Sequence, residues 1–149
     1  MQKQPFAQPP FASLVEDHKK VKGIIEQLLA TSATAKKTRQ DLLGSLKKEL
    51  ESHEALEEKL LYPALKQQKP THDMALEAYQ EHHVVDVLLD ELESLDFQDE
   101  AWKAKLRVLQ ENLLHHIREE EEQLFPKAAK TLDEGQLNHI EQGIEQARR

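Results

Sequence analysis

The chain has 149 residues, which suits one domain with a sizeable core, and its 32% of charged residues with only 4 glycines is typical of helical proteins. The formal net charge of −8 disfavours a general role in binding nucleic acid or an anionic membrane. The absence of cysteine excludes disulfides, thiolate metal sites and cysteine nucleophiles. No apolar run has the length of a signal-peptide core or a membrane span, so we expect a soluble cytoplasmic protein.

The first expected element in chain order is an irregular arm over residues 1–10, which carry three of the six prolines. Helical periodicity then predicts a helix over about 11–31, with Ser13 as its cap and Glu16 completing a capping box. Further long helices are predicted over about 35–67, 72–95 and 99–130, before a shorter final one.

These elements predict an all-α fold, because no alternating strand pattern of useful length occurs. Short connections between long amphipathic helices favour an antiparallel up-down four-helix bundle with a short extra C-terminal helix. We expect this bundle to occupy residues 11–149, with its core in 11–130.

The chain also contains an internal repeat. Aligning His53 with His116 gives the shared pattern H-x3-E-E-x2-L-aromatic-P, preceded by leucines in register. The upstream helices align as well, DHKKVKGIIEQL (17–28) with EHHVVDVLLDEL (81–92), which places His18 over His82. Each half is therefore predicted to be a helical hairpin with a histidine on its first helix and His-x3-Glu on its second.

The repeated polar residues lie on the stripes that face the core, since steps of three and four separate them from leucines and valines. The set consists of His18, His53, Glu57, His82, His116 and Glu120. A buried carboxylate without a partner loses several kcal/mol of solvation, and no Lys or Arg shares the stripe at a neighbouring step. Six nitrogen and oxygen donors could instead hold two metal ions, and imidazole with carboxylate suits iron, manganese or zinc.

These motifs carry a family resemblance over roughly residues 11–130. The chain resembles hemerythrin-like proteins of the HHE cation-binding type in EDHKKV, in HEALEEKLLYP, in EHHVVDVLLDEL and in the segment from His116 to QLFP. The resemblance implies a four-helix bundle that holds two iron ions in an oxo- or hydroxo-bridged centre, with manganese or zinc as possible substitutes. It implies the following iron ligands: His18, His53, Glu57, His82, His116 and Glu120.

The sequence departs from classical oxygen-carrying hemerythrin in two places. The third helix offers adjacent histidines at 82–83 rather than two histidines one turn apart, and the fourth-helix carboxylate is Glu120. The resemblance therefore extends neither to a seventh protein ligand nor to reversible oxygen carriage. Ferritin-like proteins use Glu-x-x-His, which is not the motif that repeats here.

Several neighbours of the six residues have more ordinary interpretations. His83 and His115 lie one step off the stripe and are expected at the surface or a helix boundary, with a role as substitute ligands as the alternative. A solvated acidic face, from which one carboxylate could reach the site, is expected from Glu58, Glu119, Glu121 and Glu122. Core aromatics are expected at Tyr62, Phe125 and Trp102, with a hydrogen bond from Tyr62 to a ligand as the alternative. We expect the prolines after Tyr62 and Phe125 to kink or stop their helices, and His72 and His139 to lie at the surface.

The leading functional hypothesis is a di-iron protein that binds or handles dioxygen, peroxide or nitric oxide. One alternative is an iron or oxygen sensor whose bundle is ordered by metal and read by a partner. The other is a metal-free helical interaction bundle. Nucleic acid and membranes are not expected partners, the pattern leaves the oligomeric state open, and no positioned acid–base residue decides whether the protein is an enzyme.

Overall fold

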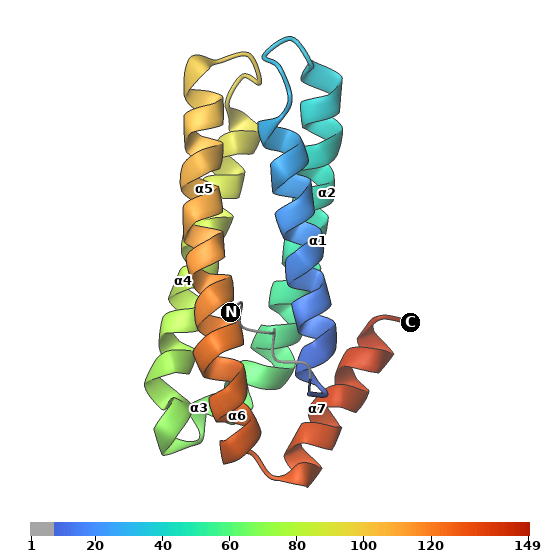
Figure 1. Cartoon of the computed structure of the whole chain (residues 1–149), viewed down its shortest axis with the longest axis vertical. Coiled ribbons are helices and arrows are strands. Elements are labelled where there is room, and N and C mark those ends of the chain that lie inside the picture. Colours follow the sequence, from blue (N-terminus) through green and yellow to red (C-terminus); the bar gives the residue numbers. More distant parts are fainter. Residues whose placement is uncertain (1–7) are drawn as a thin grey trace, which may run out of the picture.

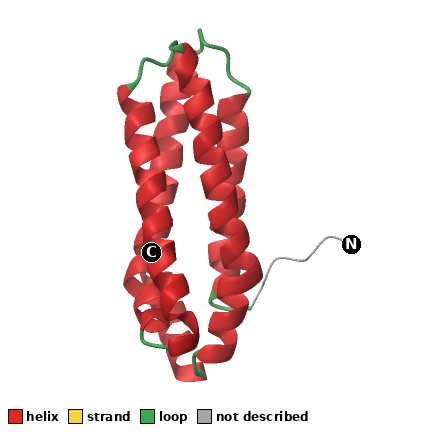
Figure 2. Cartoon of the chain, turned by 90° about the vertical axis from the view of Figure 1, so that its left-hand side faces the viewer, coloured by secondary structure: helices red, strands yellow, loops and turns green. Residues whose placement is uncertain are grey.

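Four long helices run antiparallel in the computed structural model, which describes residues 8–149 (Figures 1 and 2). They are α1 (Phe11–Leu29), α2 (Lys36–Leu56), α4 (His72–Ser94) and α5 (Glu100–Glu119). A further helix, α7 (Glu134–Ala147), lies beside the start of α1 (Figure 1). The predicted all-α bundle with an extra C-terminal helix is confirmed, and the described residues contain no strand. Most of the predicted N-terminal arm lies outside the described residues.

The second helix of each hairpin continues past its proline through a widened turn. Helix α2 passes through the π-helical turn η1 (Glu57–Leu61) into α3 (Tyr62–Lys66). Helix α5 likewise passes through η3 (Glu120–Leu124) into α6 (Phe125–Thr131). In each π turn the N–H of the aromatic residue before the proline donates to the carbonyl five residues back, Tyr62 to Glu57 and Phe125 to Glu120. The wider turn accommodates the proline ring, which in a regular α-helix clashes with the carbonyl four residues before it. Both prolines were expected to kink or stop the helix; neither stops it, since helical residues continue to Lys66 and Thr131.

The predicted cap of α1 is wrong. The helix begins at Phe11, directly after a turn at Pro9 and Pro10, and the Phe11 N–H donates to the carbonyl of Gln8 at 2.8 Å. Ser13 therefore lies inside the helix, where its hydroxyl donates to the Pro10 carbonyl at 3.4 Å. The helix start near residue 11 is as predicted, but the backbone turn takes the place of the Ser13 side chain as the cap. A capping box does form at the start of α7, between Asp133 and Gln136. The short 3-10 turn η2 (Lys69–Thr71) connects α3 to α4.

Two apolar clusters fill the core, and the polar stripe lies between them. The cluster near α3, α6 and α7 contains Phe11, Tyr62 and Phe125, all fully buried. The cluster toward the far end of the bundle is rich in leucine and includes Trp102. Along α1, Leu14 belongs to the first cluster and Val21 to the second, and His18 separates them. The candidate ligands are thus shielded from water on both sides.

The far end of the bundle is closed by a buried arginine. The Arg39 guanidinium donates to the Thr31 hydroxyl at 2.9 Å and to the Phe97 carbonyl, and it lies 4.4 Å over the ring of Trp102. The predicted packing role of Trp102 is confirmed, since this side chain is fully buried. Among the described residues, no helix is long and apolar enough to cross a membrane.

Candidate metal centre

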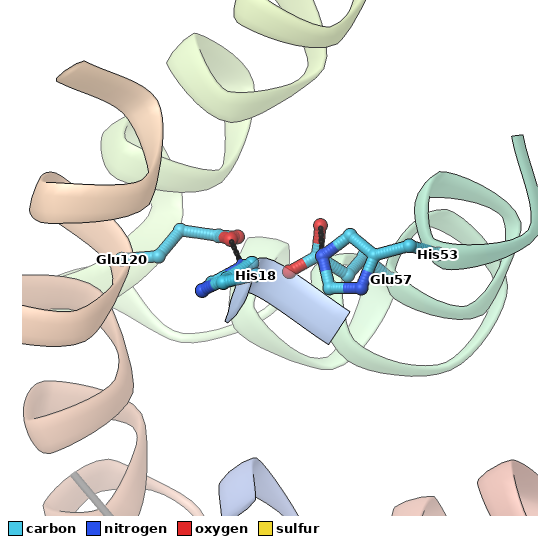
Figure 3. A group of neighbouring side chains, drawn as sticks. All are labelled: His18, His53, Glu57 and Glu120. Atoms are coloured by element: carbon cyan, nitrogen blue, oxygen red, sulfur yellow. Dashed lines mark hydrogen bonds and ion pairs between the residues drawn. The ribbon is translucent and has the colours of Figure 1, made fainter. Parts of the chain in front are cut away.

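The six residues singled out by the repeat come together inside the bundle. Their ligand atoms form two groups within which all atoms lie within 4.8 Å of one another. The first group consists of His18, His53, Glu57 and Glu120, from α1, α2 and the two π turns (Figure 3). The second consists of Glu57, His82 and His116. All six side chains are buried, and each hairpin contributes to both groups through its glutamate or histidines.

Each carboxylate lies between imidazoles of opposite hairpins. Glu57 Oε1 is 3.1 Å from both His53 Nε2 and His82 Nε2. Glu120 Oε1 is 3.1 Å from His18 Nε2 and 3.4 Å from His116 Nε2. Two carboxylates that each face two imidazoles are suited to bridge a pair of cations.

The outer nitrogen of every imidazole is held by a further carboxylate. The Nδ1 to oxygen distances are 2.6 Å for His18 with Glu121, 2.8 Å for His53 with Asp17, 2.8 Å for His82 with Glu58 and 2.8 Å for His116 with Glu81. Since a carboxylate accepts, each Nδ1 carries the proton and each Nε2 is turned toward the centre. Carboxylates of this kind orient metal-binding histidines and raise their basicity.

Sequence reasoning missed part of this outer set. Glu58 and Glu121 were expected on a solvated face, but Glu58 reaches His82 and Glu121 reaches His18, each across to the opposite hairpin. Asp17 and Glu81 were not singled out at all. A signal was present, because an acidic residue directly precedes the first-helix histidine in both copies of the repeat.

Three buried polar atoms test whether a cation fits here. Within residues 8–149, Glu57 Oε2, His53 Nε2 and His116 Nε2 find no hydrogen-bond partner, although the two nitrogens lie close to carboxylate oxygens. Buried polar atoms in native proteins nearly always have a partner. All three belong to the two groups and are oxygen or imidazole donors, so a first-row transition metal would satisfy them. The residues therefore fit a metal pair.

In this arrangement the imidazoles bind protons tightly. Burial would lower the pKa of His53, but the negative charge of Glu57 and the hydrogen bond to Asp17 outweigh it and raise that pKa to about 10. The pKa of His116 is likewise raised despite burial, by the charge of Glu120. Burial opposes ionisation of Glu120, yet the charge of His116 holds its pKa well below the usual range. Protons thus compete with metal for the same atoms.

The two aromatic residues before the prolines are fully buried, as predicted, but they differ in chemistry. The Tyr62 hydroxyl lies 2.5 Å from Glu120 Oε2, 3.1 Å from Glu57 Oε1 and 3.2 Å from His82 Nε2. Burial, and then the charges of both glutamates, raises the pKa of Tyr62 well above its usual value, so it remains a donor. Its counterpart Phe125 stacks on His18 at 5.9 Å between ring centroids.

A further buried carboxyl, Glu54, lies beside the centre. Burial and then a hydrogen bond with Asp86 raise the pKa of Glu54 to about 10, so this group is neutral near pH 7. Its counterpart in the repeat is Ile117, and both line a cavity of about 10 Å3 against the histidines. That asymmetry explains why the repeat gave no signal for Glu54.

The remaining predicted residues lie as expected or nearly so. His83, His115 and His139 are exposed, which confirms their surface assignment. His72 is half-buried and its Nδ1 donates to the Lys66 carbonyl at 2.7 Å. Of the predicted acidic face, Glu122 is exposed.

Comparison with known proteins agrees with this geometry. The sequence model of the Hemerythrin HHE cation binding domain matches residues 10–128. A crystal structure of a hemerythrin HHE cation binding domain-containing protein from Mycobacterium kansasii superposes with a TM-score of 0.77 at 23% identity, over 93% of this chain and 86% of that one. A DNA nickase from a Nostoc species is 28% identical over 109 residues, 73% of this chain. The chain spans only 30% of that nickase.

Proposed function

This chain belongs to the hemerythrin HHE cation-binding domain family, and from that premise we propose that it is a non-haem di-iron protein that binds or handles dioxygen, peroxide or nitric oxide. One observation carries the proposal: two buried groups of His and Glu donors share Glu57, and three of their atoms lack any hydrogen bond. Imidazole with carboxylate is a donor set that suits iron.

The chain's own residues have distinct parts in this function. The Nε2 atoms of the four histidines would bind metal while outer carboxylates such as Asp17 and Glu81 hold their Nδ1 protons. Glu57, which belongs to both groups, would span the two positions, and Glu120 would add a donor to the first. Bound iron would supply reversible redox change and open positions for a small ligand. Tyr62 would hold a proton at its hydroxyl within reach of that ligand.

The surroundings favour a ligand of few atoms. The cavity against the histidines measures about 10 Å3 and is lined by apolar side chains including Val21, Leu50 and Leu113. A space of that size holds at most about one water molecule. The apolar wall excludes bulk water from the centre and admits a small neutral gas more readily than an ion.

The test is metal content combined with optical spectroscopy. Protein produced with iron should contain about two iron ions per chain, one for each group of donors. Its absorption bands should change on addition of azide, peroxide or oxygen. Folded protein that takes up no iron would refute the proposal, and iron-loaded protein that responds to none of these ligands would refute the ligand-handling part.

The metal-free interaction bundle accounts less well for the centre. It requires Glu57 Oε2 and two imidazole nitrogens to stay buried without hydrogen bonds. It also predicts that replacing His53 and Glu57 together by leucine leaves the protein as stable or more so. A clear loss of stability in the double variant relative to the iron-loaded wild type would exclude it.

A further inference from the structure

A third group of metal-ligating side chains lies on the outside of the bundle, in the second half alone. Glu81 on α4 and His115 and Glu119 on α5 bring ligand atoms within 4.8 Å of one another. His115 Nε2 is 3.0 Å from Glu119 Oε1 and 3.8 Å from Glu81 Oε2. We call Glu81, His115 and Glu119 the outer triad. His115 and Glu119 repeat the His-x3-Glu spacing of the inner ligands, and each directly precedes one of them, His116 and Glu120, in the sequence.

The internal repeat gives an independent reason to expect a cation there. In the first half, the carboxylate that holds the second-helix histidine is Asp17, and Arg148 donates to both its oxygens at 3.1 and 2.7 Å. Its counterpart Glu81 also holds a second-helix histidine, but its other oxygen faces His115, and Glu119 lies beside it, with no arginine or lysine in the place of Arg148 among the described ion pairs of Glu81. A bound cation at the outer triad would supply the charge that Arg148 supplies in the first half.

The outer triad also borders a path to the inner centre. An open groove of about 770 Å3 is lined by all three of its residues. A second pocket, of about 90 Å3, is lined by Glu81 and Glu119 and extends to the buried ligand Glu120. The groove and the pocket are lined by four glutamates, Glu77, Glu81, Glu119 and Glu120, against one lysine, Lys66. The path is therefore acidic on balance from its mouth to Glu120.

We propose that Glu81, His115 and Glu119 form an outer divalent-cation site that captures a first-row transition metal ion at the mouth of the pocket leading to Glu120. One imidazole and two carboxylates suit Fe2+, Mn2+ or Zn2+. The triad is partly open, with 61% of the His115 side chain exposed, so water would complete the coordination and the ion could leave again. The capture role rests on the proposed function, because it requires an inner centre to fill.

The variants to compare are His115→Ala and Glu119→Gln, since Glu81 also holds His116 and its replacement would disturb the inner centre. Matched controls are His83→Ala and Glu122→Gln, an exposed histidine and an exposed glutamate outside the triad. Calorimetry on iron-loaded protein should show one Zn2+ ion bound per chain, with affinity lowered about tenfold or more in both triad variants and unchanged in the controls.

The second measurement is the rate of iron uptake by metal-free protein after mixing with Fe2+. The triad variants should load about tenfold more slowly, because a charged site concentrates cations at the mouth of the path, and should reach the same final iron content. Absent Zn2+ binding, or binding unchanged by His115→Ala, overturns the outer site. Normal loading rates overturn the capture role. No iron uptake, while the metal-free protein still binds Zn2+ in a way that His115→Ala weakens, overturns the proposed function and the capture role together, while the outer site stands.

Discussion

In the first half of the bundle His18 and His53 meet edge to face with ring centroids 4.9 Å apart, and in the second half His82 and His116 meet at the same distance and nearly the same angle. The pattern of outer carboxylates is also the same: one comes from the residue before the first-helix histidine and one from the opposite hairpin. The repeat therefore reproduces the inner donors and their supports almost unchanged.

The surroundings of the two pairs differ. Phe125 stacks on His18, whereas Tyr62 places a hydroxyl 3.2 Å from His82. Arg148 neutralises Asp17 from outside, whereas Glu81 faces the acidic groove. The first pair is thus closed by apolar and cationic groups, and the second is open to polar ones. The two metal positions would therefore have unequal electrostatic surroundings.

The largest expected effect separates the two glutamates. Glu57 belongs to both groups and Glu120 only to the first. Glu57→Gln should therefore reduce iron from about two ions per chain to nearly none, because both groups lose the carboxylate that they share, whereas Glu120→Gln should leave about one, because the second group keeps all its donors. Metal analysis of the purified variants measures this, with Glu122→Gln as the control. Equal losses in the two variants would show that the second group also depends on Glu120.

Alkaline pH should destabilise the metal-free protein in both halves alike. The folded pKa values of His53 and His116 are raised above the ordinary value for histidine, that of His53 to about 10. Because the folded protein binds these protons more tightly than the unfolded chain, protonation stabilises the fold. This contribution is fully present below the unfolded pKa of about 6.5 and is lost as pH rises through the folded pKa. Denaturation with a chelator present should give a free energy of unfolding lower at about pH 9 than at about pH 6, by about 1.4 kcal/mol or more. A flat profile would contradict the raised pKa values.

Tyr62→Phe makes the surroundings of the His82 and His116 pair resemble those of the His18 and His53 pair, where Phe125 stacks on His18. Glu120 loses a buried hydrogen-bond donor, so the metal-free variant should be less stable by about 1–3 kcal/mol. Iron content should remain that of the wild type, because Tyr62 lies outside the six donors. Chemical denaturation and metal analysis check both statements. Tyr79→Phe is the control, since its hydroxyl contacts only the Glu58 carbonyl, at 3.5 Å, and unchanged stability is expected there.

The smallest effect is expected at Arg148, whose side chain is 37% exposed. Solvent screening limits the stability lost in Arg148→Ala to about 1 kcal/mol or less. Iron affinity should fall by up to about tenfold, because Asp17 would hold His53 less firmly. Arg148→Lys should recover only part of this, since an ammonium cannot contact both oxygens in parallel. Competition with a chelator measures the affinity; a similar loss in the neighbouring Arg149→Ala would contradict this role.

The sequence alone was sufficient for the bundle and for the six inner residues. Steps of three and four placed His18, His53 and their counterparts among leucines, and the second copy of the pattern made coincidence an unsatisfactory explanation. The helix ends were less well predicted. The start of α1 near residue 11 was right, but its cap was wrong, because a backbone turn at Pro10 preceded the side-chain signal at Ser13. The π turns at Glu57 and Glu120 left no trace in periodicity beyond the prolines that follow them.

Other features were decided only by the tertiary structure. Glu121 reaches His18 and Arg148 reaches Asp17 across separations of 103 and 131 residues. The outer triad and the contact of Glu54 with Asp86 likewise join different helices. Local periodicity determines which face of a helix is buried, because that face depends only on the angle between successive residues. Which side chains meet across the bundle depends on how each helix is rotated and shifted against its neighbours, and that follows from packing of the whole core.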